Sequence, residues 1–184
     1  MRLFVSLAAL VVCMSTAPAT AQFQVLGRSA AATCFEHAVA ARHDVRAIQD
    51  CDMALRDNRV TRRDRAATLV NRGILRIHQN RQDEALEDFE RAESLHDFAP
   101  SALAVNRACA LIGLGRYAEA VAQADLAIRA QDSREADAWF NRGLALEAMD
   151  ELAAAYDSYR QARRLRPGWD LPQDELSRFR ITSR

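Results

Sequence analysis

Apolar and small residues recur along the chain at the three- and four-residue spacing of amphipathic helices. Leu69 and Gly73 share one stripe of a first helix, and Ala85, Phe89 and Ala92 have the spacing of a facing stripe on a second helix. A small residue opposite an aromatic one lets two helix backbones approach closely while the ring fills the space beside them. Turn-forming residues separate the stripes, at Gln79-Asn80, Gly113 to Gly115 and Met149-Asp150. The pattern therefore predicts units of helix, tight turn and helix.

The helical units repeat with a fixed period. The triplet Asn71-Arg72-Gly73 returns as Asn106-Arg107-Ala108 and again as Asn141-Arg142-Gly143, each 35 residues after the one before. Helical patterning within a period in the mid-thirties predicts a stacked array of helical hairpins, in which each hairpin buries its apolar face against its neighbours. The expected fold class is all-α.

The best-formed unit, residues 136–169, resembles a tetratricopeptide repeat. It matches that family at Trp139, Gly143, Ala155, Tyr159, Ala162 and Pro167, and it departs from the family at Arg142 and Leu146. Units 66–100 and 101–135 match more loosely. The resemblance implies a right-handed α-solenoid of about three antiparallel hairpins. A degenerate hairpin at 22–65 is expected before them and a capping helix at 170–184 after them, with Asp170 as its N-cap.

Composition narrows the classes of function. The 25 acidic residues balance the 25 basic ones, and every basic residue is Arg. Zero formal net charge gives no reason to expect nucleic acid as a partner, and the absence of Lys excludes Schiff-base and P-loop lysine chemistry. No GxSxG, HExxH, CxxC or Gly-rich phosphate-loop motif occurs. We therefore expect no catalytic residue, no cofactor and no enzyme activity.

The N-terminal segment is typical of a secretory signal peptide. Met1 and Arg2 form a short positive start, residues 3–14 are apolar, and residues 15–21 end in the small-x-small pattern that signal peptidase requires. We expect cleavage after Ala21 and a periplasmic or secreted mature protein. The alternative is an N-terminal membrane anchor, for which the apolar run is short, since a bilayer-spanning helix needs about 20 residues. No other segment is apolar enough to span a membrane.

Export changes what the cysteines are expected to do. The mature chain keeps Cys34, Cys51 and Cys109, and thiols that lie close together pair in an oxidising compartment. In the degenerate hairpin that the resemblance implies, Cys34 lies on the first helix and Cys51 on the second, both facing the seam. We therefore expect a Cys34–Cys51 disulfide and a reduced Cys109. The alternative is a small metal-binding or enzymatic periplasmic protein, in which the two cysteines hold zinc together with His37 and His43.

Two runs of Arg are the densest basic stretches. Their members are Arg59, Arg62, Arg63 and Arg65 in the first run, and Arg160, Arg163, Arg164 and Arg166 in the second. We interpret the first run as a solvated turn between hairpins. The second falls near the end of a helix, where cations interact favourably with the helix dipole. A docking patch for an acidic partner or an anionic lipid is the alternative for both runs.

The family resemblance also implies a binding surface. In the family, the residue two positions after the first aromatic points into the concave groove, and in several members an Asn there hydrogen-bonds the main chain of a bound extended peptide. The matching residues here are Asn71, Asn106 and Asn141. Neighbouring positions predict an apolar groove floor, made of Val70, Ile74, Val105, Cys109, Phe140 and Leu144. The alternative is that these Asn side chains bond to neighbouring helices and only lock the superhelix.

Two further expectations concern charge. Arg72 and Asp88 fall at positions that should form an ion pair within one unit. One subtype of the family binds a C-terminal carboxylate with cations beside the Asn, and the matching positions here lack them, so we expect no such clamp.

The predicted function is a non-catalytic protein-interaction scaffold of the bacterial envelope, which binds an extended peptide or a partner's surface. The identity of the protein or peptide partner is open, self-association is possible, and no metal site is expected.

Overall fold

The computed structural model describes residues 29–42, 44–95 and 100–179. Within these ranges the chain forms helices and no strand. The helices are α1 (Ala30–Val39), α2 (Val45–Arg56), α3 (Arg62–His78), α4 (Gln82–Leu95), α5 (Pro100–Gly113), α6 (Tyr117–Ala130), α7 (Glu135–Ala148), α8 (Leu152–Leu165) and α9 (Asp170–Ser177).

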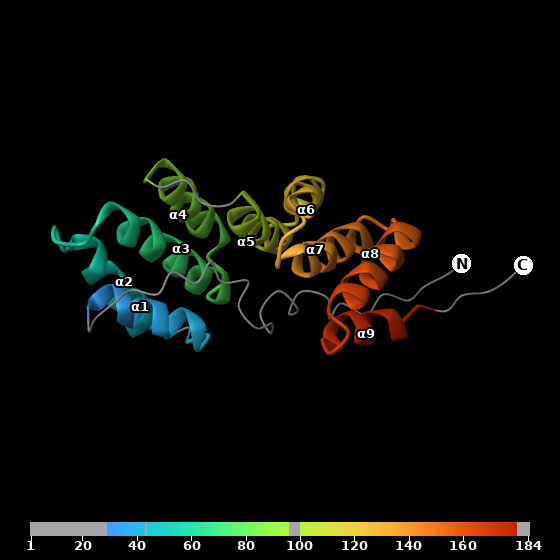
Figure 1. Ribbon diagram of the computed structural model, residues 1–184, viewed down its shortest axis with the longest axis horizontal. Helices are drawn as coiled ribbons and strands as arrows, with labels where there is room; N and C mark the ends of the chain where they lie inside the picture. Colours follow the sequence, from blue (N-terminus) through green and yellow to red (C-terminus); the bar gives the residue numbers. More distant parts are fainter. Residues whose placement is uncertain (1–28, 43, 96–99, 180–184) are drawn as a thin grey trace, which may run out of the picture.

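The helices pack as a curved row of hairpins (Figure 1). Each of α1, α3, α5 and α7 packs against the helix that follows it, and the next hairpin then packs against the pair. The short α9 packs against α8 at the C-terminal end of the row. The all-α solenoid predicted from the 35-residue period is confirmed.

One turn position recurs in the three central hairpins. Asn80, Gly115 and Asp150 follow α3, α5 and α7, and each has a positive φ, of 57°, 71° and 62°. The left-handed conformation favours Gly and is tolerated by Asn and Asp, because their short polar side chains bond locally. The recurring Asn, Gly and Asp therefore allow the tight reversal that brings each helix back along its predecessor.

Close packing between paired helices depends on small residues. A Cβ atom added at Gly73 would lie 2.5 Å from Cε1 of Phe89, and one added at Gly143 would lie 2.5 Å from Cε1 of Tyr159. The middle unit solves the same problem differently, since Ala108 and Ala124 stand at the matching positions and both are fully buried. At this position of the three central hairpins, the bulky ring thus faces a glycine, and the small Ala124 faces an alanine.

Two helix starts differ from the sequence prediction. Thr61 caps α3, because its Oγ1 accepts a hydrogen bond from the Asp64 amide at 3.1 Å, so the helix begins at Arg62 rather than near residue 66. Most of the first Arg run therefore lies in a helix and not in a solvated turn. At the other end, the N-cap of α9 is Trp169, so the prediction of Asp170 as N-cap is wrong by one residue.

Candidate functional site

The predicted signal segment and His43 lie outside the described residues. Among the residues that are described, no helix is both long and apolar enough to cross a membrane. In the same ranges, no three metal-binding side chains gather closely enough to hold an ion.

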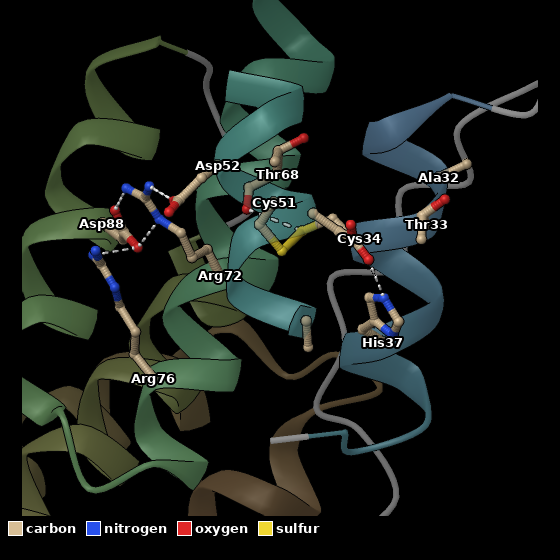
Figure 2. The surroundings of a disulfide bond; sticks show 12 residues. Ala32, Thr33, Cys34, His37, Cys51, Asp52, Thr68, Arg72, Arg76 and Asp88 are labelled. Carbon is tan, nitrogen blue, oxygen red and sulfur yellow. Dashed lines mark hydrogen bonds and ion pairs between the residues drawn. A yellow bond between two sulfur atoms is a disulfide. The ribbon is translucent and has the colours of Figure 1, made fainter. Parts of the chain in front are cut away.

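The two N-terminal cysteines are bonded to each other (Figure 2). Cys34 on α1 and Cys51 on α2 are both fully buried, with their Cα atoms 4.8 Å apart. One helical turn further along α1, Nε2 of His37 lies 2.8 Å from Oδ2 of Asp50 on α2. Sulfur atoms that share a disulfide cannot act as thiolate ligands. The alternative zinc site therefore loses two of its four predicted ligands in this structure.

A buried charge network joins the N-terminal hairpin to the next unit (Figure 2). The Arg72 guanidinium donates two hydrogen bonds to the Asp88 carboxylate, at 2.9 and 2.6 Å, and a third to Asp52 on α2 at 2.6 Å. Arg76 also pairs with Asp88, which is fully buried, at 2.7 Å. Burial acts to lower the pKa of Arg72, but its bonds to the two carboxylates outweigh burial and raise it. The predicted Arg72–Asp88 pair is confirmed.

The same Arg position behaves differently in the two later units. Arg142 repeats the bridging arrangement, since it donates to Asp125 on α6 at 2.9 Å and to the Ser158 hydroxyl on α8 at 2.8 Å. Arg107 instead donates to Glu93, on the helix before it, at 2.7 Å. The residue of α6 that matches Asp88 is Gln123, whose buried Oε1 accepts no hydrogen bond from the described residues. The middle unit therefore lacks the internal polar bridge of its neighbours.

The three repeated Asn side chains also differ from one another. Asn71, Asn106 and Asn141 are all buried, with 2%, 5% and 7% of their surface exposed. Asn141 donates through Nδ2 to the Val105 carbonyl of α5 at 3.2 Å, which is the superhelix-locking bond of the alternative interpretation. The Nδ2 of Asn106 is buried and has no hydrogen-bond partner among the described residues. Among the described residues, the buried amide donor of Asn106 is thus unsatisfied, whereas that of Asn141 is bonded.

The predicted groove floor is mostly packed into the core. Ile74 and Cys109 are half-buried, whereas Val70, Val105, Phe140 and Leu144 are at most 5% exposed. Phe140 shows why, since its ring packs 4.8 Å from that of Trp169 and 5.7 Å from that of Tyr159, measured between centroids. The expectation of an open apolar floor is corrected on this point, and a binding role for these residues stays a prediction.

A polar network under the last helix was not foreseen from the sequence. The Tyr159 hydroxyl donates to Oε2 of Glu147 at 2.8 Å, and Arg178, just after α9, donates to the same carboxylate at 2.8 and 2.9 Å. Arg178 also pairs with Glu175. Burial, and then the neighbouring Glu147 charge, raise the pKa of Tyr159 well above its usual range. The partners lie on three different helices, so no local sequence pattern signals the network.

Comparison with known proteins agrees with the geometry. Residues 136–168 match the family model described as a tetratricopeptide repeat. The chain is similar to the NMR structure of the first TPR domain of the human RPAP3 protein, with a TM-score of 0.55 and 27% sequence identity over 61% of this chain and 87% of that domain. No curated protein shows significant similarity. The chain thus contains a tetratricopeptide repeat within a solenoid of the kind that serves as a protein-interaction scaffold.

Proposed function

We propose that this protein is a non-catalytic scaffold of the bacterial envelope, and that it binds an extended segment of a partner protein along the faces of α3, α5 and α7 that carry the repeated Asn residues. The N-terminal sequence supports the envelope setting, because it has the three parts of a cleavable export signal. The Cys34–Cys51 bond supports it independently, since structural disulfides persist mainly in oxidising compartments.

The observation that carries the binding proposal is the unsatisfied amide of Asn106. A buried donor without an acceptor costs about 1–3 kcal/mol. Asn141 avoids this cost by donating to Val105, the residue 36 positions before it, whereas the matching bond from Asn106 to the Val70 carbonyl is not formed. If the Asn106 side chain rotates toward the surface, a main-chain carbonyl of a bound segment would satisfy the donor. Binding at the middle unit would therefore recover free energy that the free protein lacks.

The surrounding chemistry indicates what kind of segment binds. Half-buried Ile74, Cys109 and Ile112 offer apolar contacts near the Asn positions. The nearby carboxylates are already used within the chain, since Asp137 pairs with Arg166 at 2.9 Å and Glu147 pairs with Arg178. A segment with apolar side chains and an accessible main chain suits this surface better than a charged one.

The test compares two Asn variants at the same repeat position. Extended peptides that bind residues 22–184 are selected from a displayed random library, and their dissociation constants are measured by calorimetry. Loss of one buried hydrogen bond is worth about 0.5–1.5 kcal/mol, so Asn106→Ala should weaken binding about 3- to 12-fold. Asn141→Ala is the matched control and should act mainly on the stability of the stack, because its amide bonds to Val105.

The comparison separates the two interpretations of the Asn residues. Selected peptides that bind wild type and Asn106→Ala equally well would refute the proposed role of Asn106. Failure to select any peptide from a library of high diversity would count against the binding of extended segments as a whole.

A further inference from the structure

The outward side of α4 carries a row of exposed carboxylates. Asp83, Glu87 and Glu90 are exposed and lie at i, i+4 and i+7, which places them on one helical stripe. None of the three takes part in an ion pair among the described residues, whereas Glu84 and Glu93 on the same helix pair with Arg81 and Arg107. The stripe is thus a row of solvated carboxylates, of which Asp83 interacts electrostatically with Arg116 and none forms an ion pair among the described residues.

The outward side of α8 carries the opposite charge. Arg160, Arg163 and Arg164 are all exposed, and Arg164 makes no ion pair among the described residues. Arg166 does not belong to this surface, because it is held by Asp137 and stacks on Trp169 at 4.8 Å. A surface hollow of about 510 Å³ lies on this side of the helix, lined by Asp157, Arg160, Gln161, Arg163, Arg164 and Pro167. The hollow gives protruding side chains a place to enter.

The helix between them is close to neutral on its outer side. Glu119 pairs with Arg116 at 2.7 Å, and Asp125 pairs with Arg142 at 2.9 Å. The exposed Ala118 and Ala122 carry no charge. Figure 1 shows α4 and α8 toward opposite ends of the row with α6 between them. The protein has no formal net charge, yet its outer helices run from acidic to basic along the solenoid.

We propose that the Arg stripe of α8 docks the carboxylate stripe of α4 from a second copy of this chain. The two surfaces have complementary charge and similar helical spacing, and Glu87, Glu90 and Arg164 form no ion pair among the described residues. The two stripes lie at opposite ends of one molecule, so the contact is heterologous. In the resulting pair, one copy keeps a free α4 stripe and the other keeps a free α8 stripe, so the association continues head to tail unless the geometry closes a ring.

The ionic strength of the solution tests the electrostatic origin of the contact. Residues 22–184 are examined by sedimentation velocity at protein concentrations from 10 µM to 1 mM, in 10 mM and in 500 mM salt. The Debye length falls from about 30 Å at 0.01 M to a few ångströms near 1 M, so exposed pairs weaken strongly. The average mass should rise with protein concentration in low salt and stay near that of a monomer in high salt.

Charge reversal identifies the surfaces. One variant carries Glu87→Arg and Glu90→Arg, and a second carries Arg160→Glu and Arg164→Glu. Each alone should remain monomeric in low salt, because its reversed stripe now repels the unchanged stripe of another copy. Mixed in equal amounts, the two variants should associate again, since the new Arg stripe of the first meets the new Glu stripe of the second. The exposed Arg129 on α6 provides the matched control, and Arg129→Glu should associate like wild type.

Each outcome decides the proposal. A wild-type protein that stays monomeric in low salt at 1 mM refutes it, and so does association that both charge-reversal variants retain. Variants that lose association but do not recover it on mixing would refute the direct pairing of the two stripes. Circular dichroism of each variant confirms that the helices are intact. Peptide capture by the Asn positions does not involve these stripes, so this result and that of the Asn106 test are independent.

Discussion

Alkaline pH should destabilise this protein mainly through one tyrosine. The Tyr159 side chain is fully buried between α7, α8 and α9, and its hydroxyl donates to the Glu147 carboxylate. Ionisation would leave a buried phenolate facing a carboxylate, which is why burial, assisted by that charge, raises the pKa of Tyr159. In the unfolded chain, the Tyr159 hydroxyl ionises near the ordinary tyrosine pKa of about 10.

The sign and size of the effect follow from proton linkage. Between the unfolded and the folded pKa, the folded state holds one more proton than the unfolded state, so the free energy of unfolding falls as pH rises. The loss begins near pH 10 and amounts to about 1.4 kcal/mol for each further pH unit. The stabilisation is fully present below the unfolded pKa, and at neutral pH the effect is absent.

The chain is well suited to this measurement because it contains no Lys. Lysine side chains, whose ordinary pKa of about 10.4 lies close to that of tyrosine, therefore add nothing to the measured pH dependence. Urea unfolding followed by circular dichroism gives the free energy at several pH values for wild type, Tyr159→Phe and Tyr156→Phe. Subtracting the free energy of unfolding of Tyr159→Phe from that of wild type at each pH removes the contributions of all groups that the two proteins share.

Tyr159→Phe should cost about 1 kcal/mol at pH 8, because it removes the bond to Glu147 and leaves that carboxylate to Arg178. Above pH 10 the deficit should shrink and reverse, since the variant escapes the alkaline loss. Tyr156→Phe, which removes a hydroxyl from the same helix without touching the bond to Glu147, is the matched control. Equal pH slopes for wild type and Tyr159→Phe would refute the reasoning, because they would show that the phenolate is tolerated in the folded protein.

Two further predictions concern the N-terminal half. Arg72→Ala should lower the free energy of unfolding, measured with urea, by about 3 kcal/mol, because it removes two hydrogen bonds from the fully buried Asp88. Arg107→Ala, at the same repeat position, should lower it by at most about 1 kcal/mol, because its partner Glu93 is largely exposed. Equal losses would contradict the assignment of the first pair as buried. Protein recovered from the envelope should begin at Gln22, and its unfolded form should show one reactive thiol before reduction and three afterwards. Three reactive thiols before reduction would contradict the disulfide, and a retained N-terminal Met would contradict the export. Replacing Cys34 and Cys51 by Ser should then cost about 2–4 kcal/mol.

Local periodicity explains why some features could be predicted from the sequence. The stripes of Gly73 and Phe89 fix a helical hairpin, because a helix repeats every 3.6 residues and the ring needs a facing glycine. The Arg72–Asp88 pair and the cysteine pair each lie within one hairpin, where sequence spacing determines which side chains meet. The 35-residue period then copies the hairpin and predicts the solenoid.

The start of α3 shows where a composition argument misleads. The run of Arg between two predicted hairpins suggested a solvated turn, but Thr61 caps a helix that begins four residues earlier than expected. Arg65 then reaches back and donates to the Asp57 carbonyl at 3.0 Å, just beyond the end of α2. A long guanidinium can thus serve the preceding helix, and its own sequence neighbourhood does not reveal this role.

The sequence by itself determined the helices, their pairing and the period, because these depend on residues close together along the chain. Only the tertiary structure decided which partners are bonded by chemically identical side chains at equivalent repeat positions. Arg107 turned to Glu93 while Arg72 turned inward, and Asn141 found a carbonyl that Asn106 did not. Such choices depend on how closely successive units pack and on which acceptor the neighbouring helix presents. A repeat pattern predicts where a side chain lies on its own helix. The partner of that side chain lies on a neighbouring helix, and the distance between the two helices depends on the packing of the whole stack.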